Sequence, residues 1–143
     1  APLEAEDDHY DGKLVAASAL PADPAAFAAR LRASLAAWEA GGTRGVWLRL
    51  GLAQSALIPL AVAQGFEFHH AEKDHLMMTR WLPTAIPCTL PANASHQVGV
   101  GAFVVNSRHE VLVVQERSGV LRGKGVWKMP TGLVAAGEDF TAA

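Results

Sequence analysis

The chain has 143 residues, enough for one ordinary domain or for one small domain and part of a second. Half of the residues are hydrophobic and 18% are charged, which predicts a folded core and excludes a wholly disordered chain. The formal charge of −2 leaves no overall electrostatic footprint for nucleic acid.

An acidic terminus and a helix are the first predicted elements. Residues 1–9 are rich in Asp and Glu and are expected to be flexible. Residues 13–20 predict a strand. A helix is predicted from Asp23 and Pro24, because the carboxylate can cap free amides and proline at the first helical position sacrifices no hydrogen bond. Its core-facing stripe, which glycines 41–42 terminate, comprises Phe27, Leu31, Leu35 and Trp38.

The following residues complete a predicted α/β module. Residues 45–50 alternate as a strand, and residues 54–64 predict a second helix whose regularity Pro59 limits. Short strands at 66–70 and 75–81 follow, joined by a charged hairpin at 72–74. The closing stretch, a helix leading into Gly65 and two short strands, resembles the end of an acetyltransferase-like fold, and this resemblance carries no activity.

Three histidines, His69, His70 and His75, lie in the last two strands of this module. Neighbouring residues of a regular strand point to opposite faces, so the first two are not expected to share a metal ion. We therefore expect these histidines to be structural.

A proline-punctuated segment separates this module from a second pattern. Prolines within residues 83–95 prevent a helix or a central strand there, which predicts a linker. Residues 97–105 and 111–115 then predict strands joined by a turn at 106–109, and residues 126–134 a third extended segment.

The cysteine content and the apolar runs bear on compartment and membrane. One cysteine, Cys88, allows no disulfide framework and indicates a reducing, intracellular setting. Cytoplasm and organelle, either chloroplast or mitochondrion, both stay open, because a removed transit peptide is compatible with a start at Ala1. The uncharged stretch 50–66 is interrupted by polar residues and proline, so we expect a buried helix and no membrane partner.

Residues 127–138 carry the chemically informative motif. Trp127, a proline and a small residue precede Gly132, and five residues separate Gly132 from Glu138. This arrangement resembles the opening of the Nudix signature, which continues with seven residues, an Arg-Glu pair and, one helical turn later, a Glu-Glu pair. Trp127 itself is expected to pack in the core or loop rather than to stack a base.

The resemblance extends from about residue 10 to the end of the chain. Segments 45–48, 65–66, 69–72, 81–83, 95–102 and 113–117 occur in an order that resembles plant and animal Nudix proteins with an N-terminal acetyltransferase-like extension. The implied fold class is α/β: an acetyltransferase-like module at 10–82, the linker at 83–95, and the first strands of an incomplete Nudix α/β/α sandwich at 96–143.

The resemblance also implies a chemistry. Nudix proteins hydrolyse nucleoside diphosphates linked to another group, here ADP-ribose, NADH or CoA-type compounds, with Mg²⁺ or Mn²⁺. The carbonyl of Thr131 resembles a family metal ligand, Gly132 and Gly137 form the motif turn, and Glu138 matches the signature glutamate that supports the loop. The basic residues expected to face substrate phosphates, unless they are merely solvated surface, are Arg117, Lys124 and Lys128.

The Arg-Glu pair of the signature would begin at position 146, beyond Ala143. We therefore expect the chain to be cut off within its motif, to bind no metal and to be inactive on its own. The alternative is a non-catalytic binding or structural module within a larger assembly or homo-oligomer, because incomplete sheets leave edges and apolar faces that favour association.

Overall fold

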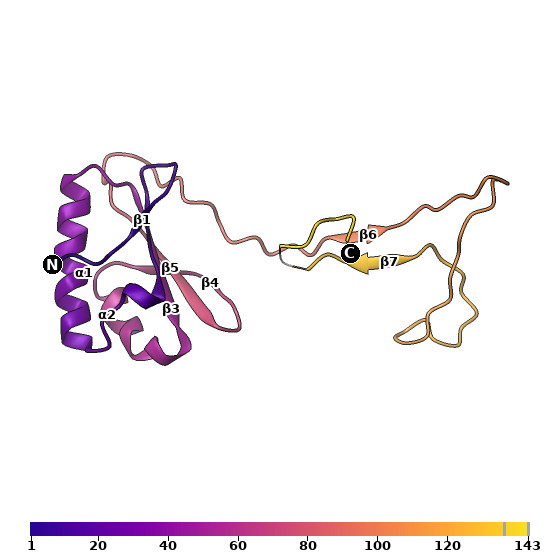
Figure 1. Ribbon diagram of the computed structural model, residues 1–143, viewed down its shortest axis with the longest axis horizontal. Helices are drawn as coiled ribbons and strands as arrows, with labels where there is room; N and C mark the ends of the chain where they lie inside the picture. Colours follow the sequence, from indigo (N-terminus) through magenta and orange to yellow (C-terminus); the bar gives the residue numbers. More distant parts are fainter. Residues whose placement is uncertain (136, 143) are drawn as a thin grey trace. The chain divides into compact units, whose positions relative to one another are not determined.

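The computed structural model describes residues 1–135 and 137–142, which form a mixed α/β chain (Figure 1). Two compact units divide it, Ala1–Asn93 and Ala94–Ala143, and we call them the N-terminal and the C-terminal unit. The N-terminal unit contains a five-stranded sheet and the C-terminal unit a two-stranded one.

The sheet of the N-terminal unit has the order β1-β2-β3-β5-β4. Its strands are β1 (Glu6–Asp7), β2 (Lys13–Val15), β3 (Gly45–Gly51), β4 (Glu67–Ala71) and β5 (His75–Trp81). Only β2 and β3 pair in parallel, and α1 (Pro24–Ala40) makes the crossover that a parallel pair requires. Every other pairing is antiparallel.

Helix α1 confirms the predicted start and stripe. The Asp23 carboxylate accepts a hydrogen bond from the Ala26 amide at 2.6 Å, and Pro24 occupies the first helical position. Gly42, with φ of 83°, lets the chain leave the helix in a conformation that other residues adopt at a cost. The buried side chains of the helix are Phe27, Leu31, Ser34, Leu35 and Trp38.

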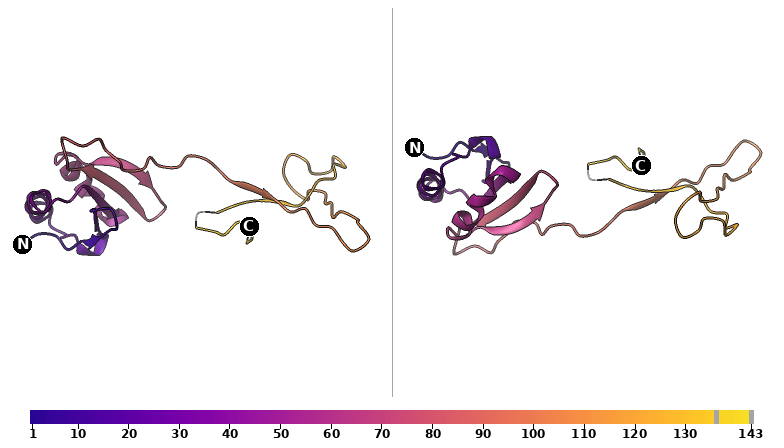
Figure 2. Two further views of the ribbon diagram at one scale, coloured as in Figure 1. Left: turned by 90° about the horizontal axis from the view of Figure 1, so that it is seen from above. Right: turned by 90° about the horizontal axis from the view of Figure 1, so that it is seen from below.

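The core of the N-terminal unit lies between α1 and one face of the sheet, as both views of Figure 2 show. On β3, Val46, Leu48 and Leu50 are buried, and Met78 pairs with Leu48 from β5. A side chain of this size contributes about 1.5–3 kcal/mol when fully buried, so each residue of this layer stabilises the unit.

The second predicted helix is divided in two. Residues Leu52–Leu57 form a 3₁₀ helix, η2, and Ile58–Val62 form the short helix α2. Pro59 is the reason, because it has no N–H to donate to residue 55 in a continuous α-helix but is tolerated in the first turn of a new one. The predicted strand 13–20 also ends early, at Val15, and a 3₁₀ helix, η1 (Ala17–Ala19), follows it.

The terminus expected to be flexible is instead built into the fold. Leu3 is buried, and its amide donates to the Ser34 hydroxyl of α1 at 2.6 Å. Strand β1 then pairs Glu6 with Leu14. The acidic composition of the terminus gave no indication that Leu3 would be buried. This burial anchors the segment to the helix.

Part of the segment expected to be a linker also packs on the N-terminal unit. The Trp81 indole N–H donates to the Ile86 carbonyl at 3.0 Å, and the Pro91 carbonyl lies 2.8 Å from His69 Nε2. Leu90 occupies the space above Gly45, where a Cβ would come within 2.8 Å of Leu90 Cδ2. The segment therefore lies against the sheet face opposite α1, with Leu90 as the apolar side chain that packs on it.

The C-terminal unit is an extended, thinly packed chain segment. Strands β6 (Gly99–Gly101) and β7 (Thr131–Leu133) pair antiparallel, and single bridges join Val105 to Val111 and Val114 to Lys128. The predicted turn at 106–109 is present, closed by Asn106 and Glu110. The predicted strands are shorter than expected because none of the described residues of this unit is buried.

None of the helices in the described part of the chain has the length and apolar character needed to cross a membrane.

Candidate functional site

The motif strand β7 directs the Thr131 carbonyl toward its open edge, as it does that of Leu133. The Ala102 amide donates to the Pro130 carbonyl at 2.9 Å, and the Val134 amide donates to the Val98 carbonyl at 3.0 Å. Hydrogen-bonded and non-hydrogen-bonded pairs alternate along an antiparallel ladder. The pair Gly101–Thr131 between them is therefore non-hydrogen-bonded, so the Thr131 carbonyl points away from β6.

Glu138 closes the turn that follows β7. Its carboxylate accepts a hydrogen bond from the Ala135 amide at 2.7 Å, and its own amide donates to the Ala135 carbonyl at 3.1 Å. These reciprocal bonds match half of a capping box, in which a glutamate satisfies an amide three residues earlier. Gly137 has φ of 78°, a value that a residue with a Cβ adopts only with strain.

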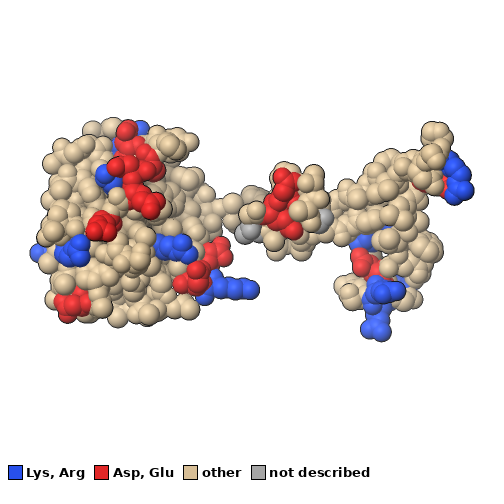
Figure 3. Space-filling view, viewed as in Figure 1, with Lys and Arg blue, Asp and Glu red and all other residues tan. Residues whose placement is uncertain are grey.

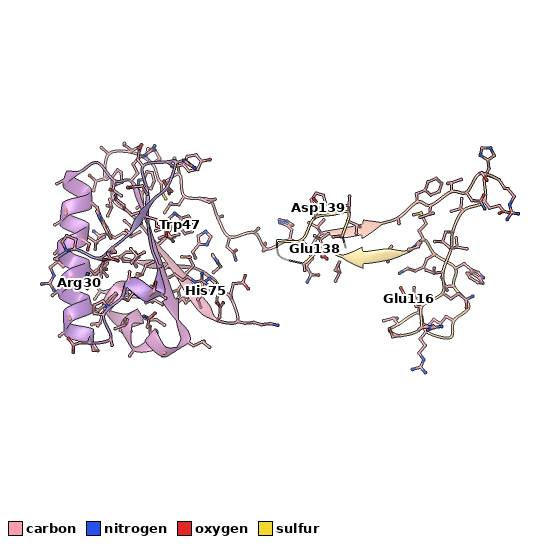
Figure 4. The ribbon with its side chains drawn as sticks, in the orientation of Figure 1. Arg30, Trp47, His75, Glu116, Glu138 and Asp139 are labelled. Atoms are coloured by element: carbon pink, nitrogen blue, oxygen red, sulfur yellow. The ribbon has the colours of Figure 1, made fainter. Side chains whose placement is uncertain are left out.

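A second acidic residue, which the sequence analysis did not single out, follows this turn. Asp139 Oδ1 accepts hydrogen bonds from the amide and the hydroxyl of Thr141, and these bonds hold the pKa of Asp139 below its ordinary value. Figure 3 shows acidic side chains gathered there, where Figure 4 labels Glu138 and Asp139. Turns occupy residues 140–142 of the described part.

The three basic candidates have different surroundings. Lys128 is half-buried, and its ammonium group pairs with the Glu116 carboxylate across the Val114–Lys128 bridge. Arg117 and Lys124 are exposed, and among the described residues no ion pair engages either of them. Of the three basic residues, Lys128 is thus the one whose charge is already paired within the structure.

The donors near β7 make only part of a divalent-cation site. The Thr131 carbonyl is a suitable oxygen ligand, but Mg²⁺ requires near-octahedral oxygen coordination that includes carboxylates. Within residues 1–135 and 137–142, no cluster of three His, Cys, Asp or Glu side chains has a geometry that could hold a metal ion. These residues alone therefore do not fit a complete metal centre.

The histidines of the N-terminal unit are closer together than strand alternation predicts. A β-bulge at His69 shifts the register of β4, and the Nδ1 atoms of His69 and His70 lie 2.7 Å apart. The expectation that these two side chains point to opposite faces was wrong, because a bulge adds one residue and cancels the alternation. His75, labelled in Figure 4, is bonded instead to Asp74 at 2.7 Å.

Asp74 and Arg49 complete this polar cluster. Arg49 Nη2 lies 3.0 Å from the Asp74 carboxylate and 3.2 Å from His75 Nδ1. The hydrogen bond from His75 is the main reason that the pKa of Asp74 lies below its ordinary value. The contacts favour a structural role, as the sequence analysis expected.

Two family models together match almost the whole chain. The Nudix hydrolase domain model matches residues 3–82, and the NUDIX domain model matches residues 95–143. The second match contains the motif strand, Gly132 and Glu138.

Relatives from plants and animals match over the same length. Nudix hydrolase 8 of Arabidopsis thaliana is 53% identical over 138 residues, covering 96% of this chain and 37% of that relative. Nudix hydrolase 2 of the same plant is 50% identical over 138 residues, which cover 96% of this chain and 49% of that relative. Nucleoside diphosphate-linked moiety X motif 6 of Homo sapiens is 42% identical over 143 residues, covering 96% and 44%.

The chain spans between about a third and a half of the length of these curated relatives. Its mixed α/β structure is consistent with the Nudix fold. On the strength of these matches, the chain belongs to the Nudix hydrolase family.

Proposed function

We propose that the protein carrying this chain hydrolyses nucleoside diphosphates linked to a second group, with ADP-ribose, NADH or a CoA-type compound as substrate. Membership of the Nudix family supports the reaction class, because its members act on small nucleotide substrates with divalent metal ions. The observation that carries the proposal is the turn after β7, where Glu138 secures the loop and the Thr131 carbonyl stays open.

In this proposal the residues of β7 and its turn prepare a metal site rather than complete it. A bound Mg²⁺ or Mn²⁺ supplies charge neutralisation and a water of lowered pKa. Thr131 offers one ligand oxygen, Gly137 shapes the turn, and Glu138 fixes the loop through the Ala135 amide. Gly132, which was also expected in the turn, lies within β7 instead, where it pairs with Val100. The carboxylates that would complete the site belong to signature positions numbered beyond this chain.

Substrate phosphates are the proposed partners of the free basic groups. Arg117 and Lys124 are exposed and lie on either side of a segment that contains Gly119 and Gly123, so both can reach an anionic ligand. Lys128 contributes less in this proposal, because Glu116 already neutralises its charge.

The assignment of domains along the chain is also a proposal. We assign residues 10–82 to an acetyltransferase-like module without acetyl transfer activity, residues 83–95 to a connecting segment, and residues 96–143 to the first part of a Nudix domain. The parallel β2–β3 pair crossed by α1 supports an α/β module of this kind.

The proposal is tested by hydrolysis in water enriched in ¹⁸O. A protein that contains this chain followed by the remaining signature positions is incubated with ADP-ribose or NADH and with Mg²⁺ or Mn²⁺. We expect cleavage of the diphosphate with ¹⁸O on one phosphate product, and no turnover by residues 1–143 alone. Absence of turnover with every nucleoside diphosphate derivative, or turnover by residues 1–143, would refute it.

A non-catalytic binding or structural module is the second candidate. It is favoured by the exposed apolar side chains of the C-terminal unit, among which Phe103, Leu133 and Phe140 are between 66% and 71% exposed. If this candidate is right, the 143-residue chain associates into defined oligomers. Sedimentation velocity over a hundredfold range of concentration decides, because a strictly monomeric chain would exclude self-assembly.

A further inference from the structure

A second candidate ligand site lies in the N-terminal unit, in a cavity beside Trp81 that measures about 630 Å³. This volume falls within the range of small-molecule pockets, about 300–1,000 Å³. Its walls include Tyr10, Arg44, Trp47 and Trp81, none of which belongs to the Nudix motif. Leu90 and Pro91 also line it.

The aromatic walls are held in place before any ligand binds. Trp47 pairs with Thr79, and Gly45 pairs with Trp81, so both indoles project from the same face of the sheet. This is the face opposite α1, as the position of Trp47 in Figure 4 shows. The Trp81 indole is fixed by its bond to Ile86, and the Trp47 ring meets His69 edge-on at a centroid distance of 4.8 Å.

Arg44 gives this cavity a positive charge that no described carboxylate neutralises. Its guanidinium carbon lies 5.1 Å from the centre of the Trp81 ring, a cation–π contact. The buried Nε atom has no hydrogen-bond partner among the described residues, and no ion pair joins the guanidinium to a described carboxylate. A guanidinium has five N–H donors and forms its strongest bonds with anionic oxygens.

Asp8 limits the charge that the cavity accepts. Its carboxylate lines the same cavity, and its Oδ1 atom accepts the amides of Tyr10 and Gly12, each at 2.7 Å. One positive and one negative side chain therefore face the space. Asp8 repels every negative charge on a ligand, but the first can be offset by bonding to Arg44, whereas a second has no basic partner in the lining.

We propose that this cavity binds a planar aromatic monoanion. Its ring packs against the indoles of Trp47 and Trp81, and its anionic group accepts hydrogen bonds from Arg44. Hydrolysis at the Nudix motif is not needed for this binding, so the two proposals stand or fall separately.

Naphthoate, a planar aromatic monoanion, serves as the probe. The ¹⁵N-labelled 143-residue chain is titrated while the indole N–H resonances are followed, each assigned by substitution of its tryptophan with phenylalanine. We expect saturable shifts of the Trp47 and Trp81 resonances and none at Trp38 or Trp127. The neutral naphthylmethanol and the cationic naphthylmethylammonium are expected to bind at least tenfold more weakly.

Charge substitutions of opposite sign make the test specific. Arg44→Gln is expected to weaken naphthoate binding about tenfold, and Asp8→Asn, which keeps an oxygen for the turn amides, to tighten it several-fold. Arg49→Gln is the matched control, since Arg49 lies on β3, which Arg44 immediately precedes, but does not line the cavity. Arg44→Lys keeps the charge and provides a second variant should the first unfold, which the core Trp38 resonance would reveal.

Three results would overturn the proposal: naphthoate leaves the Trp47 and Trp81 resonances unmoved, the cationic probe binds as tightly as naphthoate, or Asp8→Asn weakens binding.

Discussion

The Glu138 carboxylate lies 2.7 Å from the backbone nitrogen of Ala135 and accepts its hydrogen bond. The first glutamate of the motif thus acts on the loop between β7 and the turn, at the end of the strand that presents the Thr131 carbonyl. A carboxylate that accepts a hydrogen bond from a backbone amide has fewer lone pairs free to bind a metal ion. This geometry supports the positioning role proposed for Glu138.

Replacing Glu138 should therefore loosen the loop. We expect Glu138→Ala to speed hydrogen exchange of the Ala135 amide about fivefold, corresponding to about 1 kcal/mol for one lost hydrogen bond. Glu138→Gln keeps an acceptor oxygen and should change this rate little. Glu110→Ala, elsewhere in the same unit, is the control. Equal exchange rates in all three variants and the parent would show that the bond does not hold the loop.

Lys128 should matter less for substrate than the unpaired basic residues. In a catalytically complete protein, we expect Lys128→Gln to raise KM less than about threefold, because Glu116 already neutralises the ammonium group. Arg117→Gln and Lys124→Gln should each raise KM about tenfold through loss of a charge-assisted contact with phosphate. Steady-state kinetics on ADP-ribose provide the comparison. A larger effect at Lys128 than at the other two positions would reverse this assignment.

Leu3 should contribute to stability as a core residue does. It is 4% exposed, so Leu3→Ala is expected to lower the free energy of unfolding of the N-terminal unit by about 2–5 kcal/mol. Leu52, which is 72% exposed, provides the matched control, and Leu52→Ala should cost less than about 0.5 kcal/mol. Urea unfolding followed by tryptophan fluorescence measures both, because Trp38, Trp47 and Trp81 all belong to the N-terminal unit. Equal midpoints for the two variants would mean that the terminus is not part of the core.

Asp74 should titrate below the ordinary aspartate pKa of 3.8, mainly because His75 donates a hydrogen bond to it. A carboxyl whose pKa is lower in the folded state stabilises the fold above the unfolded pKa, and this contribution is lost as pH falls through the folded pKa. We expect His75→Phe to raise the pKa of Asp74 more than Arg49→Gln does, since the Arg49 charge is the smallest cause. Carboxyl ¹³C NMR titration distinguishes the variants, and the opposite order would contradict this account.

Local chemistry predicted α1 and β3 well. The Asp23 cap, Pro24 and the apolar stripe all act within a few residues, and β3 alternates because one face packs on α1. The turn at Gly137 and Glu138 follows the motif spacing, whereas Gly132, which was expected in the same turn, lies within β7. Patterns of this kind depend on short-range geometry, so they can be recognised in the sequence without knowledge of the tertiary fold.

Features that depend on distant contacts could not be predicted in this way. The bulge at His69 brings two histidines together, yet no sequence pattern in residues 67–71 indicates an extra residue in the pairing with β5. Burial of Leu3 requires α1 to lie beside it, and the Glu116–Lys128 pair requires a bridge between separate segments. Each is set by a partner far along the chain.

The most direct test of the central claim is paramagnetic broadening by Mn²⁺ in a protein that contains this chain and the rest of the signature. If the open Thr131 carbonyl borders the divalent-ion site, the Thr131 and Gly132 amide resonances should broaden at substoichiometric Mn²⁺, and removal of the Glu-Glu pair should abolish the effect. Unaltered Thr131 and Gly132 signals, with broadening confined to other parts of the protein, would contradict the account.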